Sequence, residues 1–236
     1  MSEQVKKRTL WDWMQLLLLP VLLLVIALAL GIQQYQQAQA MAQQARQQQV
    51  TMLRIATTQQ QDSILLAYTS SISDMLVHSK LLHSSPIDDV RVAAQADTLT
   101  TLQQLDPAHK GMLLRYLFQT KLINNDFQII NLREADFRGA LLHNVDLRDT
   151  YLYGADLRGA DVSGANLSYA TLVFTNMAGA NMTATDLHGS DLRGADVSGS
   201  NLKSANLQDA QNTRDDQLAK AKSLAAATMP DGATHS

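Results

Sequence analysis

The 236-residue sequence contains no cysteine, and this absence excludes disulfide bonds, thiolate metal sites and cysteine nucleophiles. Aromatic residues are also scarce, at 5% of the chain, so the few that face solvent merit attention. Basic residues form no large cluster either: outside Lys6, Lys7 and Arg8 they are scattered along the chain, and the net charge is -3. The chain therefore lacks the basic field that binds nucleic-acid phosphates, and we expect no nucleic-acid partner.

A hydrophobic run near the N-terminus predicts a transmembrane helix over residues 16–32. These 17 residues carry no charged or strongly polar side chain, and as a helix they span roughly 26 Å. Trp11 and Trp13 precede the run, where an indole suits the headgroup boundary. Three cations lie before the run and the next cation is Arg46, so the charge bias keeps residues 1–15 in the cytoplasm. We expect a single-pass membrane protein with the rest of the chain outside.

Two other interpretations of this segment stay open. A buried core helix is one, although such a helix is rarely apolar on every face. A cleaved signal peptide is the other, because it has the same basic start and leucine core, with Ala27-Leu28-Ala29 or Ala38-Gln39-Ala40 as small-residue sites. Cleavage would still export the remainder of the chain.

Residues 33–83 are predicted to form a glutamine-rich helical stalk. Glutamine and alanine dominate to about residue 61 and favour helix, but they offer little apolar surface, so a disordered linker is the alternative. From residue 64 apolar side chains recur on one helical face, which predicts packing against another element. These side chains are Ile64, Tyr68, Ile72, Met75 and Leu76.

A small helical region is predicted over residues 84–124, beside the repeats that follow. Ser84-Ser85-Pro86 interrupts the first helix, and a second is expected over residues 88–105. Asp106 is typical of an N-cap and Pro107 of a first helical position, which begins a third helix that runs to about residue 123. His109 and the other histidines of this part lack ligand spacing, so we expect surface histidines and no metal site.

The C-terminal half repeats every five residues. Every fifth residue from 127 to 207 is large and apolar, 17 in all: Phe127, Leu132, Phe137, Leu142, Leu147, Leu152, Leu157, Val162, Leu167, Leu172, Met177, Met182, Leu187, Leu192, Val197, Leu202 and Leu207. The residue two places earlier is small in most units, and Asp or Asn commonly stands between them. Neither a helix, with a period of 3.6, nor a strand, with a period of 2, keeps such residues on one side. We predict a stacked coil that turns once per unit, with each inward Leu contributing roughly 1.5–3 kcal/mol.

The segments ADLRGADVSGANL at 155–167 and SDLRGADVSGSNL at 190–202 resemble the pentapeptide-repeat family, whose motif is A(D/N)LXX. The resemblance implies a mainly β solenoid over residues 125–210, a right-handed quadrilateral β-helix with about 20 residues per coil. Segments before and after the repeats look like those of membrane-anchored bacterial pentapeptide-repeat proteins, which implies the bacterial cytoplasmic membrane as the location. The first two units depart from the motif, with Asn125 and Ile130 at the small position, so we expect an irregular first coil.

Residues 211–236 are predicted to form a capping helix and a tail. Thr213 followed by Asp216 is similar to a capping box. A helix from there places three apolar residues on one face: Leu218, Ala221 and Leu224. It should plug the last coil, because an uncovered solenoid end invites edge pairing.

One group of outward positions lacks charge. If the coil has four sides, residues 20 apart stack directly, and the group shares one side and its adjoining corner. The group consists of Tyr151, Tyr153, Tyr169, Thr171, Val173 and Phe174. A contiguous apolar patch usually marks an interface, so we expect it to bind a protein partner, a second copy or the preceding helices.

An acidic ladder of Asp136, Asp156 and Asp196 supports an alternative function. Certain pentapeptide-repeat proteins mimic DNA and shield topoisomerases, and an acidic side would serve that role. Arg138 and Arg158 interrupt the ladder, however, and an exported domain would not meet gyrase. Asp and Asn at this position are expected to bond the turn backbone instead.

Catalysis has little support in the sequence. His143 and His188 are isolated outward positions, and neither a Ser/His/Asp arrangement nor a glycine loop before a helix is present. Glycine recurs only where the coil must turn tightly. We therefore expect a non-enzymatic, membrane-anchored interaction or scaffold protein with no metal and no cofactor.

Overall fold

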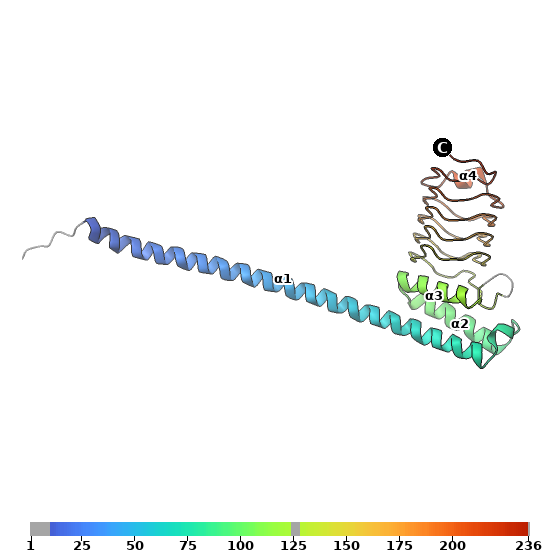
Figure 1. The fold of residues 1–236 in the computed structure, drawn as a ribbon, viewed down its shortest axis with the longest axis horizontal. Helices are drawn as coiled ribbons and strands as arrows, with labels where there is room; N and C mark the ends of the chain where they lie inside the picture. Colours follow the sequence, from blue (N-terminus) through green and yellow to red (C-terminus); the bar gives the residue numbers. More distant parts are fainter. Residues whose placement is uncertain (1–9, 124–127, 236) are drawn as a thin grey trace, which may run out of the picture. The chain divides into compact units, whose positions relative to one another are not determined.

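The computed structural model describes residues 10–123 and 128–235, and the chain divides into two compact units, Met1–Thr58 and Gln59–Ser236. The basic cluster at 6–8 and two positions of the predicted first repeats, Asn125 and Phe127, lie outside the described residues. Helix α1 spans Leu10–Val77 and begins in the first unit (Figure 1). Residues 33–61 are therefore helical, and the disordered-linker interpretation is wrong.

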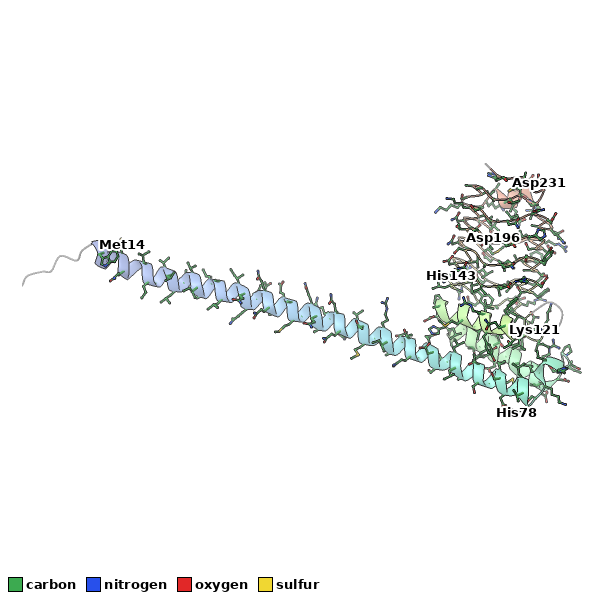
Figure 2. All side chains as sticks on the ribbon, viewed as in Figure 1. Met14, His78, Lys121, His143, Asp196 and Asp231 are labelled. Atoms are coloured by element: carbon green, nitrogen blue, oxygen red, sulfur yellow. The ribbon has the colours of Figure 1, made fainter. Side chains whose placement is uncertain are left out.

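The first unit contains one helix segment long and apolar enough to cross a membrane. Its large apolar side chains from Leu18 to Ile32 are exposed to the surroundings (Figure 2). No residue of the most apolar stretch is buried, so the segment is not a core helix of the part of the chain that the structure describes. A helix with apolar residues on all sides and nothing packed around it has the composition that lipid solvates.

The second unit begins with a base of helices. The last turns of α1, helix α2 (Asp89–Gln104) and helix α3 (Pro107–Gln119) pack together, with the short 3-10 helix η1 (Leu81–His83) between α1 and α2. Tyr68 and Ile72 on the predicted face of α1 are buried, and the Tyr68 hydroxyl lies 2.7 Å from that of Thr98. The predicted N-cap is confirmed, because the Asp106 carboxylate accepts from the first-turn N–H groups of α3.

His109 corrects the expectation of surface histidines. Its side chain is only 6% exposed and bridges two carboxylates, with Nδ1 2.8 Å from Asp106 and Nε2 3.1 Å from Asp62 of α1. Burial alone lowers the pKa of His109, but the hydrogen bonds to Asp106 and Asp62 outweigh burial and raise it. The ring therefore connects α1 to the start of α3 through hydrogen bonds to two carboxylates.

The repeats form coils of 20 residues. Parallel bridges join residues 20 apart at every fifth position, beginning with Asp136 to Asp156 and Leu141 to Asp161, so each coil has four sides. Each side contributes one bridging residue, and further backbone hydrogen bonds to the next coil lie beside it, as from Leu142 to Asp161 and from Asn144 to Ser163. The four-sided solenoid that the resemblance implied is therefore present. Its right-handed sense stays a prediction.

The core runs along the axis of the coils. All 16 of the predicted large inward residues within the described chain are at most 2% exposed. Five small-position hydroxyl residues are fully buried, and each donates to a backbone carbonyl: Thr150, Thr175, Thr185, Ser190 and Ser200. Because of these hydrogen bonds, a buried hydroxyl group is tolerated at the position that alanine occupies in other units.

Helix α3 closes the open end of the first coil (Figure 1). The Leu141 N–H donates to the Pro107 carbonyl over 2.9 Å, and the buried Lys110 ammonium donates to the Asp136 carbonyl over 2.8 Å. Gly111 makes this approach possible, since a Cβ on it would lie 2.1 Å from the Leu141 carbonyl oxygen. The helix thereby satisfies two of the edge groups of the coil.

The C-terminal end differs from the predicted capping helix. Helix α4 comprises only Asp215–Leu218, and the coil resumes after it, with bridges from Asn201 to Ser223 and from Asn206 to Thr228. The spacing of 22 in these bridges shows a two-residue insertion, which shifts the inward Leu224 and Met229 out of the five-residue register. The Gln217 amide donates to two carbonyls of the coil below, and the final residues fold back in an antiparallel bridge to Thr228.

Replacing Gly111 with Ala tests the docking of α3. The new methyl group would collide with the Leu141 carbonyl, so we expect a loss of about 1–3 kcal/mol in the free energy of unfolding. The half-exposed neighbour Met112 provides the control, because Met112→Ala should change the same quantity by less than about 0.5 kcal/mol. Urea unfolding of the full chain in detergent measures both. Equal, small effects would show that α3 does not close the coil.

The two carboxylates around His109 predict a pH dependence of stability. Because the folded pKa of His109 is raised, its contribution is complete below the ordinary value of 6.5 and is lost as pH rises through the raised pKa. The pKa of Asp106 is lowered by its hydrogen bonds with His109, which outweigh burial, so its contribution is lost only as pH falls below 3.8. Urea unfolding between pH 5 and 9 should show stability that decreases with pH. Asp62→Asn should flatten this decrease. An unchanged dependence of stability on pH in that variant would contradict the stabilising role of His109 between Asp62 and Asp106.

Candidate functional site: the aromatic side of the solenoid

Every five-residue unit makes the same corner. The N–H of the small residue donates to the carbonyl of the large residue three places earlier, as from Ala160 to Leu157. The residue before that donor has positive φ, between 55° and 68°, throughout the described units. A type II turn demands this conformation at its third residue, and glycine adopts it without strain.

Asp and Asn before the large residue bond the turn. Their side chains accept the N–H two residues ahead in 13 units: Asn131, Asp136, Asp146, Asp156, Asp161, Asn166, Asn176, Asn181, Asp186, Asp191, Asp196, Asn201 and Asn206. The turn role expected for these residues is confirmed. The repeated carboxylates thus stabilise corners whatever else they do.

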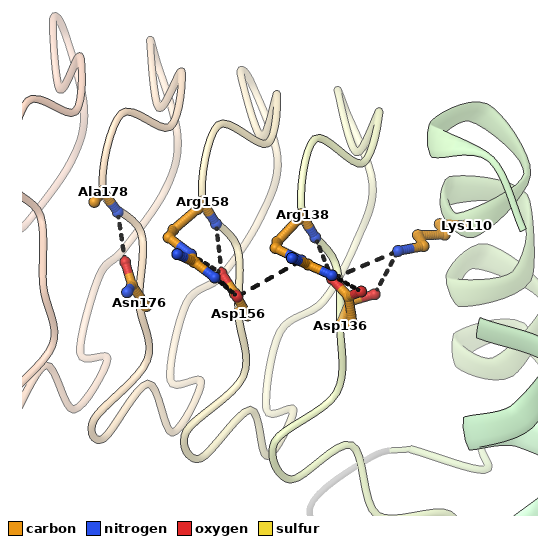
Figure 3. A network of polar contacts seen from close by, with 7 residues as sticks. All are labelled: Lys110, Asp136, Arg138, Asp156, Arg158, Asn176 and Ala178. Atoms are coloured by element: carbon orange, nitrogen blue, oxygen red, sulfur yellow. Dashed lines mark hydrogen bonds and ion pairs between the residues drawn. The ribbon is translucent and has the colours of Figure 1, made fainter. Parts of the chain in front are cut away.

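The predicted acidic ladder is largely neutralised. Arg138 forms a two-point ion pair with Asp136, and Arg158 does the same with Asp156, while Lys110 lies 3.6 Å from the Asp136 carboxylate (Figure 3). Hydrogen bonds from Arg138 hold the pKa of Asp136 well below its usual range. These pairs dilute the negative field that a DNA mimic would need.

Three predicted interface residues meet on one side of the coils. We define the aromatic side as residues 131–134, 151–154, 171–174 and 191–194, which stack through the bridges Tyr151 to Thr171 and Thr171 to Asp191. The Tyr151 and Tyr153 rings are nearly parallel, at 9°, with centroids 6.1 Å apart. The Phe174 ring meets Tyr153 edge-on at 5.6 Å. Such aromatic pairs are worth about 0.5–1.5 kcal/mol each beyond their burial.

The other predicted residues take different places. Thr171 is half-buried beneath this cluster, and Val173 is only 8% exposed, so it adds little free surface. Tyr169 lies at the adjoining corner but pairs with His188, edge-on at 5.2 Å and with a hydroxyl–Nε2 distance of 3.0 Å. The structure therefore brings three of the six predicted residues into ring contact, places Thr171 and Val173 on the same side, and leaves Tyr169 in a contact of its own.

Sequence reasoning missed two arginines on the aromatic side. The Arg133 guanidinium lies 4.5 Å from the centre of the Tyr153 ring, a cation–π contact, and its Nε donates to Glu134. Arg193 follows Val173 by one coil and is exposed. The 20-residue spacing places both in line with Tyr153, but the sequence alone shows only the spacing of five.

Two aromatic residues occupy the corner position that favours glycine. Phe174 and Tyr169 have φ of 56° and 58°, and they are 57% and 54% exposed. A bulky residue in this conformation costs roughly 1–2 kcal/mol. Each ring lies over a glycine one coil later, Gly194 under Phe174 and Gly189 under Tyr169. The packing recovers part of the strain, and only a glycine in the next coil leaves room for it.

The helical base contacts only the first coil of this side. Gln95 of α2 donates to the Asn131 carbonyl and accepts from the Asn131 N–H, both over 2.6 Å, and Lys110, Gly111 and Pro107 contact the open end of the coil. Phe174 remains exposed with the helices in place. The preceding helices therefore leave this ring available.

No metal-binding group stands out in the described chain. Residues 10–123 and 128–235 contain no cluster of three or more His, Cys, Asp or Glu side chains placed to hold an ion. His188 sits between Tyr169 and, at 3.7 Å, Asp209, on an exposed corner. The arrangement of the aromatic side, with the exposed ring of Phe174, two half-buried tyrosine rings and two arginines, suits recognition of another molecule.

Comparison with known proteins agrees with the repeat geometry. Residues 130–168, 160–199 and 180–211 match the family model of pentapeptide repeats, in eight copies. Comparison with curated proteins found no match.

Several solved structures are similar to the repeat region. A pentapeptide repeat protein from the thylakoid lumen of Arabidopsis thaliana is 33% identical over 37% of this chain and 64% of its own, with a TM-score of 0.30. One from Nostoc is 37% identical over 35% of this chain and 74% of its own, with a TM-score of 0.28. A plasmid-mediated fluoroquinolone resistance protein is 22% identical over 34% of this chain and 48% of its own, with a TM-score of 0.21. The chain thus spans less than two thirds of the Arabidopsis protein.

The contact between Phe174 and Gly194 predicts that substitutions at these two positions have coupled effects on the free energy of unfolding. Gly194→Ala should cost about 1–2 kcal/mol from its φ of 65° and more from collision with the Phe174 ring, 2.6 Å away. Gly179→Ala is the matched control, because Gly179 has a φ of 68° and nothing within 4 Å. In a Phe174→Gly background the cost of Gly194→Ala should fall to that of Gly179→Ala. Urea unfolding of the four variants gives the coupling, and a value below about 0.5 kcal/mol would contradict the stacking of ring on glycine.

Proposed function

Because the chain belongs to the pentapeptide repeat family, we propose that it is a non-enzymatic, membrane-anchored interaction protein whose solenoid binds a protein partner. The observation that carries the proposal is the aromatic side. Phe174 is kept exposed and in a strained backbone conformation where most corners of the solenoid have glycine or a small or polar residue. Strain retained at an exposed position is typical of functional surfaces, since stability alone selects against it.

The apolar part of α1 supports membrane anchoring. Residues 18–32 are apolar and exposed, and this length approaches that of a bilayer's hydrocarbon core. The cations at 6–8 favour a cytoplasmic N-terminus, which places the solenoid on the opposite side of the bacterial cytoplasmic membrane. On that side a DNA mimic would not encounter a topoisomerase, and the Arg138 and Arg158 ion pairs also weigh against mimicry.

The absence of native cysteine makes the topology simple to test. A single Ser198→Cys variant places one thiol on a half-buried outward position of the fourth coil, on the side that follows residues 191–194. We expect a membrane-impermeant maleimide to label it in intact cells, after outer-membrane permeabilisation where an outer membrane is present. Labelling only after lysis of the cytoplasmic membrane would reverse the proposed orientation.

Charge introduced on the aromatic side should abolish partner binding. Tyr153→Asp and Phe174→Asp place a carboxylate in the centre of the patch, so we expect loss of most protein crosslinks captured from living cells, at least about tenfold. Gln208→Asp, at an exposed outward position on another side, is the control and should keep all crosslinks. Circular dichroism and urea unfolding verify that the variants fold. Unchanged crosslinks in folded Tyr153→Asp and Phe174→Asp would refute the proposed interface.

A further inference from the structure

The aromatic side is narrow. It extends over four coils, which corresponds to about 14 Å at a spacing of about 4.8 Å per coil, and it is one coil side wide. A stable interface between folded proteins buries about 800 Å² on each partner, far more than this strip offers. A strip of these proportions fits a single extended chain laid along the solenoid axis.

The main-chain hydrogen bonds of the strip run along the solenoid axis. Leu152 donates to the Thr171 carbonyl, Gly154 to that of Val173 and Phe174 to that of Arg193, all over 2.9 Å. The strip is therefore the face of a sheet, and strand addition, in which a bound peptide pairs with a sheet edge, is not available here.

The side chains of the strip are mainly donors. The hydroxyls of Tyr151 and Tyr153 have no hydrogen bond within the described chain, whereas those of Tyr68, Tyr116 and Tyr169 each have at least one. Arg133 and Arg193 stand at the two ends. The acidic residues at the ends are already engaged, because Glu134 accepts from Arg133 and Asp191 accepts from the Arg193 N–H and from Asn212. The surface thus supplies donors and has few spare acceptors.

A proline-rich chain is the complement of such a surface. Proline has no N–H, its carbonyls accept hydrogen bonds, and its extended helix is formed before binding, so little entropy is lost. Its rings pack on aromatic faces, and aromatic grooves that recognise it are a recurring solution in peptide binding. We infer that the aromatic side binds an extended proline-rich segment of a partner protein, through Tyr151, Tyr153 and Phe174 with an arginine at each end. The inference rests on the proposed function and specifies the chemistry of its partner.

The test uses the full chain in detergent micelles and a fluorescein-labelled decaproline peptide. Fluorescence anisotropy should show saturable binding, and a Gly-Ser peptide of equal length should bind at least about tenfold more weakly. Tyr153→Phe removes only the hydroxyl and should weaken decaproline binding about threefold. Phe174→Gly should weaken it about tenfold while keeping the fold, because glycine suits the φ of 56° at this corner.

Tyr169→Gly is the matched control. Like Phe174→Gly, it removes an exposed aromatic ring from a corner residue with positive φ that lies above a glycine. The Tyr169 ring, however, contacts His188 and not Tyr153, so its removal should leave decaproline binding unchanged. Equal affinity for the two peptides, no saturable decaproline binding, or insensitivity to Tyr153→Phe and Phe174→Gly would each overturn the inference. So would binding of an oligosaccharide at the same residues in place of decaproline. If crosslinks from cells still depend on Tyr153 while decaproline fails to bind, the inference alone fails; if neither occurs, the proposed function fails with it.

Discussion

The hydrogen bonds between successive coils constrain the rest of this protein. Each coil side donates to and accepts from the side 20 residues away, so many main-chain groups of residues 136–211 are hydrogen-bonded along the axis. The inward residues of one coil then stack on those of the next and bury a continuous core, although no unit buries enough surface to fold alone. Because these bonds run along the axis, the flanks of the solenoid are sheet faces, whose side chains point outward.

The two ends of the stack are where this arrangement is incomplete. At the first coil, α3 supplies a backbone carbonyl and the buried Lys110 ammonium, and Gly111 lets the helix approach the coil closely. At the last coil, the Gln217 amide and the returning C-terminal residues bond the exposed groups. Polar caps at both ends prevent the edge pairing that would otherwise join one solenoid to another.

The corners explain both the uniformity of the repeats and their exceptions. A left-handed residue is needed once in every five, and glycine or a small or polar residue fills the position in most units. Phe174 and Tyr169 break this preference and are accommodated only because glycine follows 20 residues later. A sequence that keeps two strained rings on its surface gives up some stability there, which is why the aromatic side merits a functional explanation.

The five-residue period by itself determined that the chain coils, which residues point inward and that Asp or Asn bonds most turns, because a burial pattern that matches neither helix nor strand admits few other solutions. The N-cap at Asp106 and the apolar helix could also be predicted from the sequence, since both depend on residues that are neighbours in the chain. Tertiary structure alone decided what depends on the spacing of 20: the arginine above Tyr153 and the glycine beneath Phe174. It also decided that His109 is buried between two carboxylates and that the coil continues past residue 210 after a two-residue insertion. These features arise from contacts between residues that are distant in the sequence, and a pattern of neighbouring residues does not predict such contacts.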